Sequence, residues 1–187
     1  MNKKQIPNML SILRLLMIPA FIAVYFSEYK FVSLLVYTLA WITDVVDGYL
    51  ARRHNWITDL GKILDPLADK LMQLAAVTCL IIDDKLPLFV VVVLVIKELL
   101  MLAGSIFILR SKRVVVVSDW FGKMSTATMF AAVILLIFID TPPAWLETVL
   151  SILMVAVLLF ALMMYAFKAF VRDDSTKKKK SKKQITQ

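Results

Sequence analysis

Six long apolar runs, separated by polar breaks, account for most of the 187-residue chain. The runs cover residues 9–26, 31–47, 67–82, 86–109, 121–139 and 145–167. A helix needs about 20 residues to cross the hydrocarbon core of a bilayer, and fewer when its ends lie in the interface. Each run meets this requirement. The pattern therefore predicts an all-α integral membrane protein, built as a bundle of six transmembrane helices.

The breaks between the runs indicate how these helices are connected. The segments 27–30, 83–85 and 140–143 are short and carry charge or proline, which is typical of antiparallel neighbouring helices. The second and third runs are joined instead by a longer polar stretch, residues 51–66. Residues 1–4 are basic, as in a signal peptide, but the first run contains Arg14 and Pro19 and has no small-residue cleavage site. We interpret this run as a retained helix.

Lysine and arginine fall almost entirely on one side of the predicted bundle. The breaks expected on the other side hold only Lys30 and Lys85. Because basic loops are retained in the cytoplasm, both termini are predicted to lie there (N-in, C-in) in a multi-pass protein of the cell membrane. The basic positions on the predicted cytoplasmic side are Lys3, Lys4, Arg52, Arg53, Lys62, Arg110, Lys112, Arg113, Lys123 and the lysines near the C-terminus.

The composition predicts one membrane domain followed by a basic tail. Hydrophobic residues make up 60% of the chain and the mean hydropathy is +0.80, above the range of soluble domains. We predict a six-helix membrane domain over residues 1–172 and a disordered cytoplasmic tail over residues 173–187. Much of the net charge of +8 lies in that tail, which indicates attraction to anionic membrane lipids or simple solvation, and no nucleic-acid partner. The single cysteine excludes an intramolecular disulfide and a CxxC metal site.

Four aspartates carry the chemistry of the sequence. Asp44 and Asp47 are three residues apart and share a face of the second helix, while Asp65 and Asp69, four apart, share a face of the third. Both pairs fall at the cytoplasmic ends of their helices, so all four carboxylates can converge. Such carboxylates repel one another, and each costs several kcal/mol at membrane depth without compensation. Two Mg²⁺ or Mn²⁺ ions, which prefer oxygen ligands, would compensate the negative charge of the four carboxylates. A pair of such ions also suits a displacement reaction at phosphorus.

Small residues and one arginine accompany the aspartates. Gly48 and Ala51 lie near the carboxylate face, where they would let a nucleotide approach the helix backbone. Gly61 permits a tight turn or a close ligand ahead of the third helix. Arg52 offers a planar fork for phosphate oxygens. Pro66 is expected at the first position of the third helix.

The segment 44–69 fills every fixed position of the pattern D-x2-D-G-x2-A-R-x8-G-x3-D-x3-D, and the chain thereby resembles the CDP-alcohol phosphatidyltransferases. The resemblance implies that Asp44, Asp47, Asp65 and Asp69 bind two metal ions and that Asp69 also acts as the base. It implies a cytoplasmic active site that takes CDP-diacylglycerol and a polar or lipid alcohol acceptor and releases CMP. A homodimer is common in such families. The residues implied for the CDP pocket are Gly48, Ala51, Arg52 and Gly61.

The first helix is similar to the corresponding segment of bacterial phosphatidylglycerophosphate synthases over residues 7–14. This similarity implies that Asn8 approaches the nucleotide or the metal edge and that Arg14 faces the polar cavity. The alternative is an ordinary interfacial helix start with one intrahelical charge.

Four basic residues are the candidates for holding the acceptor: Arg14, Lys97, Arg110 and Lys123. Lys97 lies well inside the fourth run beside Glu98, and a buried lysine lines a cavity or pairs internally. The Lys97-Glu98 pair and the Gly122-Lys123 turn resemble the synthases that use glycerol-3-phosphate. A local Lys97–Glu98 ion pair, and a membrane-anchoring role for Arg110, are the alternatives.

The acceptor itself stays open between two lipid-synthesis reactions. Ser105 and Ser125 stand where the resemblance leads us to expect a further Arg and a further Lys. The positive charge available to bind an acceptor phosphate is therefore reduced. A cardiolipin synthase of the same fold, using phosphatidylglycerol, is therefore an alternative to glycerol-3-phosphate transfer, and inositol phosphate and serine are further acceptors. A small transporter is the non-enzyme alternative, but it would spread charges along the depth of several helices.

Overall fold

The computed structural model describes residues 6–54, 61–110 and 120–185, and over these ranges it contains six α-helices and no strand. Side chains are described for residues 8–49, 53–54, 61, 64–103, 122 and 124–166. Each predicted apolar run coincides largely with one helix, which confirms the all-α prediction. The helices are α1 (Ile6–Tyr25), α2 (Lys30–His54), α3 (Gly61–Ile82), α4 (Phe89–Arg110), α5 (Trp120–Phe138) and α6 (Ala144–Ile185).

Three helices are long and apolar enough to cross a membrane within the described residues. The qualifying segments are Asn8–Tyr25, Lys30–Tyr49 and Ala144–Ala166, and a shorter apolar segment covers Met124–Phe138. Helix α3 differs because Asp65, Asp69 and Lys70 all lie in its first half. The predictions of six crossings and of an N-in, C-in orientation remain predictions.

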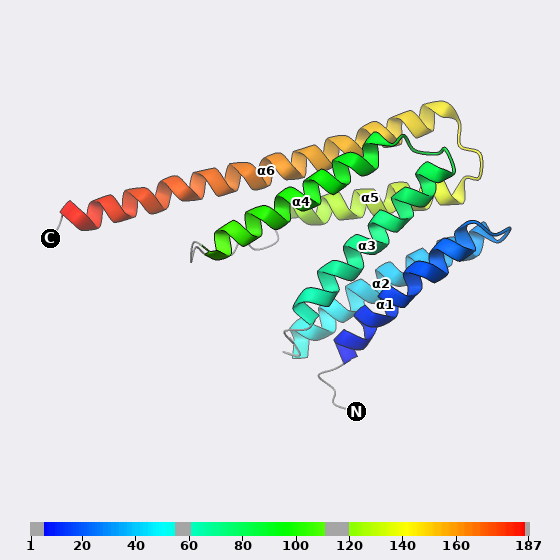
Figure 1. Ribbon diagram of the computed structural model, residues 1–187, viewed down its shortest axis with the longest axis horizontal. Helices are drawn as coiled ribbons and strands as arrows, with labels where there is room; N and C mark the ends of the chain where they lie inside the picture. The colour runs from blue at the N-terminus through cyan, green and yellow to red at the C-terminus, as the bar shows by residue number, and fades with distance from the viewer. Residues whose placement is uncertain (1–5, 55–60, 111–119, 186–187) are drawn as a thin grey trace.

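The helices form two groups that share one end (Figure 1). One group contains α1, α2 and α3, and the other contains α4, α5 and α6. The connections α1–α2, α3–α4 and α5–α6 lie together at the shared end, on the right of Figure 1, and the groups diverge from there. Helix α1 packs on α2 and α3, while α5 joins the groups by packing on α2, α3 and α6. The start of α3 and the end of α2 therefore lie at the diverging end.

The helices around the aspartates are longer than the apolar runs predict. Helix α2 continues to His54 and α3 begins at Gly61, because polar residues extend both helices beyond their apolar stretches. Pro66 consequently lies inside α3, which corrects its expected place at the first helical position. There it removes one backbone donor from the helix. All four aspartates are thus held on helical backbone.

Two further boundaries differ from the predictions. Gly122 lies in the first turn of α5, which begins at Trp120, so the expected Gly122-Lys123 turn is helical. A Cβ atom at Gly122 would lie 2.6 Å from the Tyr165 hydroxyl of α6, so a larger residue here would require the Tyr165 side chain to shift. The backbone of α6 continues to Ile185 and includes most of the segment predicted as a disordered tail.

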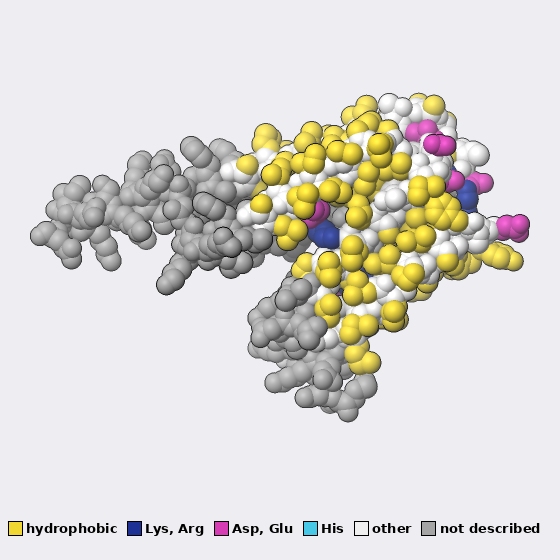
Figure 2. Space-filling view, viewed as in Figure 1, with side chains coloured by type: hydrophobic (Ala, Val, Ile, Leu, Met, Phe, Trp, Pro, Cys, Tyr) yellow, Lys and Arg dark blue, Asp and Glu magenta, His cyan; other side chains and the backbone are white. Residues whose placement is uncertain are grey.

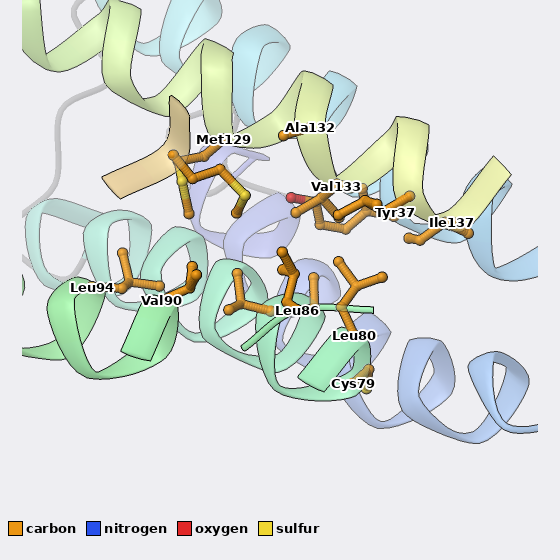
Figure 3. Close-up of a cluster of buried hydrophobic side chains, with 14 of the residues drawn as sticks. Tyr37, Cys79, Leu80, Leu86, Val90, Leu94, Met129, Ala132, Val133 and Ile137 are labelled. Atoms are coloured by element: carbon orange, nitrogen blue, oxygen red, sulfur yellow. The ribbon is translucent and has the colours of Figure 1, made fainter. Parts of the chain in front are cut away.

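The apolar core takes side chains from all six helices, and Figure 3 shows the part between α3, α4 and α5 with Tyr37 of α2. Leu80, Val90, Met129 and Val133 are among its side chains and are fully buried. Many other large apolar side chains face outward, and Figure 2 shows them covering most of the visible described surface. An apolar exterior of this extent is expected where a protein contacts lipid.

A charged network joins the helices at the end where the connections lie. Asp83 accepts a hydrogen bond from the Tyr25 hydroxyl at 3.0 Å and lies 3.3 Å from Lys85 Nζ. Lys30 pairs with Asp140 at 2.6 Å and reaches Asp83 at 3.5 Å. Lys85, which is 4% exposed, donates to the carbonyls of residues 136 and 139. We call Tyr25, Lys30, Asp83, Lys85 and Asp140 the connection-end network.

Candidate functional site

The four aspartates of the sequence pattern lie close together at the diverging end. Arg14 of α1 contacts Asp44 and Asp47, Ser11 of the same helix contacts Asp65, and Asp44 and Asp69 line one cavity. Helical spacing presents Asp44 and Asp47 from α2 and Asp65 and Asp69 from α3. We call these four residues the aspartate cluster. The four side chains thus lie in one region of the structure, and their convergence on metal ions stays a prediction.

Helix α1 supplies polar partners to three of the four carboxylates. Arg14 is 1% exposed, and its two terminal nitrogens lie 2.6 Å from Asp44 Oδ1 and 2.5 Å from Asp47 Oδ2. Ser11 is also buried, and its hydroxyl donates to Asp65 Oδ1. Ser11 and Arg14 are three residues apart and share one face of α1. That face lies against both α2 and α3 because α1 packs on both helices.

A small cavity of about 30 Å³ adjoins the cluster, with Asp44 and Asp69 in its wall. This volume is about that of one water molecule. Three buried polar atoms of cavity-lining side chains have no hydrogen-bond partner among the described residues: Arg14 Nε, Arg14 Nη1 and Gln73 Oε1. Arg14 Nη1 contacts Asp44 as a close ion pair without hydrogen-bond geometry. Aromatic rings line the apolar side of the cavity, with Trp41 stacked on Phe130 at 4.4 Å between ring centroids.

A second charged group links the aspartate cluster to α4. Lys97 of α4 is 5% exposed and donates to Glu98 Oε1 at 2.7 Å. Lys70 of α3 reaches the same oxygen at 3.2 Å and lies 3.6 Å from Asp69 Oδ2. The local ion pair that was one reading of Lys97 is therefore present, but it is shared with a second lysine. Two ammonium groups on one carboxylate leave an excess of positive charge beside Asp69.

The donor chemistry of the cluster fits divalent cations. Its side chains offer only carboxylate oxygens, the ligands that Mg²⁺ and Mn²⁺ prefer. Asp44 and Asp69 border the cavity, and their side chains are 36% and 27% exposed. Within the described residues, however, no three or more Asp, Glu, His or Cys side chains are arranged to hold an ion.

The remaining predicted site residues are only partly described. Asn8 is half-buried on α1, Gly48 is half-buried on α2, and Gly61 is buried at the start of α3. The side chains of Ala51, Arg52, Arg110 and Lys123 lie outside the described residues. Their predicted roles therefore stay predictions.

Sequence reasoning missed three polar residues of this region: Ser11, Lys70 and Gln73. Each had a signal in its spacing. Ser11 precedes Arg14 by three residues, and Gln73 follows Asp69 by four, so each pair shares a helix face. Lys70 directly follows Asp69, but only the packing of α3 near α4 shows that it reaches Glu98.

Comparisons with known proteins show a similarity to one protein family along most of the chain. A protein-family model described as CDP-alcohol phosphatidyltransferase matches residues 4–171. Similar proteins include a CDP-diacylglycerol–glycerol-3-phosphate 3-phosphatidyltransferase of Bacillus subtilis, 31% identical over 73% of this chain and 78% of its own length. Proteins of the same name from Rickettsia felis and Salmonella typhimurium are 33% and 30% identical. These matches cover 72% and 90% of this chain, and 76% and 96% of the relatives.

The family match and the aspartate cluster support one another. The match spans α1 to α5 and much of α6, so it includes both helices that carry the aspartates and the helix that carries Arg14. The chain belongs to the CDP-alcohol phosphatidyltransferase family.

Proposed function

We propose that this protein transfers the phosphatidyl group of CDP-diacylglycerol to a hydroxyl of glycerol-3-phosphate, giving phosphatidylglycerophosphate and CMP. The observation that carries the proposal is the complete aspartate pattern, converging on two packed helices within a chain of this family. The choice of glycerol-3-phosphate is supported by relatives whose names state that acceptor and that cover most of the chain.

Asp44, Asp47, Asp65 and Asp69 are the residues that would hold two Mg²⁺ or Mn²⁺ ions. Bound there, the ions would neutralise the diphosphate and stabilise charge on the attacking and leaving oxygens. For the CDP headgroup, the proposed contacts are with Asn8, Gly48, Ala51, Arg52 and Gly61. Arg52 would hold diphosphate oxygens through its guanidinium.

Asp69 is the proposed base of the reaction. It would accept the proton of the acceptor hydroxyl as the new oxygen–phosphorus bond forms, and CMP would leave with the electrons of the broken bond. Asp69 borders the cavity and remains 27% exposed, so its carboxylate is open to a substrate. Asp47, at 2% exposed, is not.

The acceptor phosphate is proposed to bind near Lys97, Arg110 and Lys123, and we add Lys70 to this group. Lys70 and Lys97 meet at Glu98 beside Asp69, so an anion there would lie a few ångströms from the base. A small phosphorylated alcohol could place its phosphate at Lys70 and Lys97 and its hydroxyl at Asp69. Arg14, also proposed as an acceptor residue, has both terminal nitrogens on Asp44 and Asp47, which leaves its Nε atom for such a contact.

A parallel acceptor assay tests the proposal. Purified full-length protein in mixed micelles with CDP-diacylglycerol and Mg²⁺ or Mn²⁺ would receive glycerol-3-phosphate, phosphatidylglycerol, inositol phosphate or serine. We expect CMP release and a new lipid with glycerol-3-phosphate. Preference for phosphatidylglycerol would establish the cardiolipin synthase alternative, and no CMP release with any acceptor would refute the enzyme assignment.

The proposal also includes six membrane crossings, with both termini and the active site on the cytoplasmic side of the cell membrane. Its support is the asymmetry of Lys and Arg along the chain. Labelling of engineered cysteines in intact cells tests it, because the native Cys79 is buried. We expect Glu28→Cys to react with a membrane-impermeant maleimide and Lys178→Cys to stay unreactive. The reverse labelling result would show that the chain has the opposite orientation in the membrane.

A further inference from the structure

Arg14 occupies an unusual position for a charged side chain. It projects from the interior of α1, is 1% exposed, and contacts two carboxylates of a neighbouring helix rather than solvent. One of these, Asp47, is itself only 2% exposed. Removing the positive partner of a buried ion pair leaves an uncompensated charge, which is strongly destabilising. In the absence of any cation, Arg14 therefore supplies the charge that Asp47 needs.

The contacts divide the carboxylate oxygens into two sets. Arg14 takes Oδ1 of Asp44 and Oδ2 of Asp47, and Ser11 takes Oδ1 of Asp65. Each of these three carboxylates has a second oxygen that α1 does not engage in these contacts. The contacts with Arg14 and Ser11 thus use one oxygen of each of these carboxylates.

The charge of Arg14 also acts on any ion that the cluster binds. Four carboxylates carry four negative charges, and the guanidinium offsets one of them at contact distance. Because charges this close interact strongly at the effective dielectric of a partly buried site, Arg14 lowers the attraction of the cluster for a second cation. The same side chain therefore stabilises the cluster without metal and weakens its hold on metal.

We propose that Arg14 is a positioning residue that acts as the internal counter-cation of the aspartate cluster. It keeps the metal-free cluster folded and limits how tightly divalent cations bind. This inference rests on the proposed metal site, and it concerns metal affinity and folding rather than turnover.

Metal binding to full-length protein in detergent micelles tests the inference without an activity readout. After removal of metals with EDTA, bound Mn²⁺ would be measured by electron paramagnetic resonance, and thermal unfolding would be followed with and without Mg²⁺. The variants are Arg14→Gln and Arg14→Lys. Arg53→Gln is the matched control, because Arg53 is exposed and donates to the Tyr49 hydroxyl on its own helix.

We expect Arg14→Gln to bind Mn²⁺ about tenfold more tightly than the wild type. It should unfold at a lower temperature in EDTA and gain more stability from Mg²⁺. Arg14→Lys, which keeps the charge, should stay close to the wild type in Mn²⁺ affinity, and Arg53→Gln should match it in every measurement. Unchanged or weaker Mn²⁺ binding by Arg14→Gln would overturn the inference, whereas a wild type that binds no Mn²⁺ would overturn the proposed metal site instead.

A second variant keeps the test decisive if Arg14→Gln does not fold. The double variant Arg14→Gln/Asp47→Asn removes the buried Arg14–Asp47 pair as a whole, so no buried charge remains at position 47. Asp44, the other partner of Arg14, is 36% exposed and remains in contact with solvent. We expect it to fold in EDTA with a thermal midpoint near that of the wild type. If the double variant fails to fold like the single one, Arg14 acts through packing and not through charge compensation.

Discussion

The two ends of the bundle each hold a charged network, and the two networks differ in charge balance. At the connection end, Lys30 and Lys85 face Asp83 and Asp140, and Lys85 has two carbonyl acceptors in addition. At the diverging end, the guanidinium of Arg14 contacts two of the four carboxylates, the Ser11 hydroxyl contacts a third, and Lys70 lies 3.6 Å from the fourth, that of Asp69. The first network is complete in itself. The second has an excess of negative charge that a cationic ligand would neutralise.

Unsatisfied polar atoms show the same difference. Among the described side chains, the buried atoms without a hydrogen-bond partner belong to Arg14 and Gln73. Both residues line the cavity beside the aspartate cluster, and neither lies at the connection end. Native structures satisfy nearly all buried polar groups, so exceptions call for an explanation such as a ligand. The comparison therefore separates a network whose buried polar atoms are paired from one that leaves polar atoms for a ligand.

The largest expected effect comes from removing the proposed base at the diverging end. Asp69→Asn should lower CMP release by about 10³-fold, because the acceptor hydroxyl loses the group that takes its proton. The thermal midpoint should change little, since Asp69 is partly exposed. Asp84→Asn is the control at the connection end. Asp84 has a φ of 58°, which asparagine tolerates, and the activity of this variant should equal that of the wild type. Near-normal turnover by Asp69→Asn would exclude it as the base.

A change in the connection-end network should lower stability and leave metal binding unaffected. Lys85→Met leaves Asp83 with less compensation and deprives two carbonyls of their donor. We expect a loss of about 3 kcal/mol in the free energy of unfolding, measured in detergent micelles, with Mn²⁺ affinity unchanged. A changed Mn²⁺ affinity with unaltered stability would reverse the roles assigned to the two ends.

Metal removal should affect only the diverging end. A ligand at one hundred times its dissociation constant stabilises the folded state by about 2.7 kcal/mol, so EDTA should lower the thermal midpoint of the Mg²⁺-saturated wild type. The Lys85→Met variant should show the same response to Mg²⁺. Asp65→Asn should show a smaller one, because it removes a proposed ligand. An equal response in Asp65→Asn would argue against ion binding at this residue.

The smallest effect concerns the exposed ion pair of the connection end. The hydrogen bond and charge of Lys30 lower the pKa of Asp140 from its ordinary value of 3.8. A carboxyl with a lowered folded-state pKa contributes stability above its unfolded pKa, and this contribution is lost as pH falls through the folded-state pKa. Thermal unfolding from pH 6 down to below about pH 4 should therefore show a slightly smaller acid-dependent loss in Asp140→Asn than in the wild type. An identical pH profile would show that the pair contributes nothing.

The sequence alone determined the helices and the pairing of the aspartates. Both are local properties: apolar runs of membrane length predict helices, and spacings of three and four residues place Asp44 with Asp47 and Asp65 with Asp69 on common faces. The helix ends were less predictable, because apolarity marks where a helix is buried and not where its backbone stops. Pro66 inside α3 is the clearest example.

Only the tertiary structure decided what surrounds the aspartates. The contacts of Arg14 with Asp44 and Asp47, and of Ser11 with Asp65, join residues 30 or more positions apart in the chain. The meeting of Lys70 with Glu98 likewise depends on how α3 lies against α4. Helical periodicity shows which face a side chain occupies, but the packing of α1 across α2 and α3 decides which face it meets. For that reason the sequence indicated Arg14 as a candidate for holding the acceptor, but only the structure shows its contacts with Asp44 and Asp47.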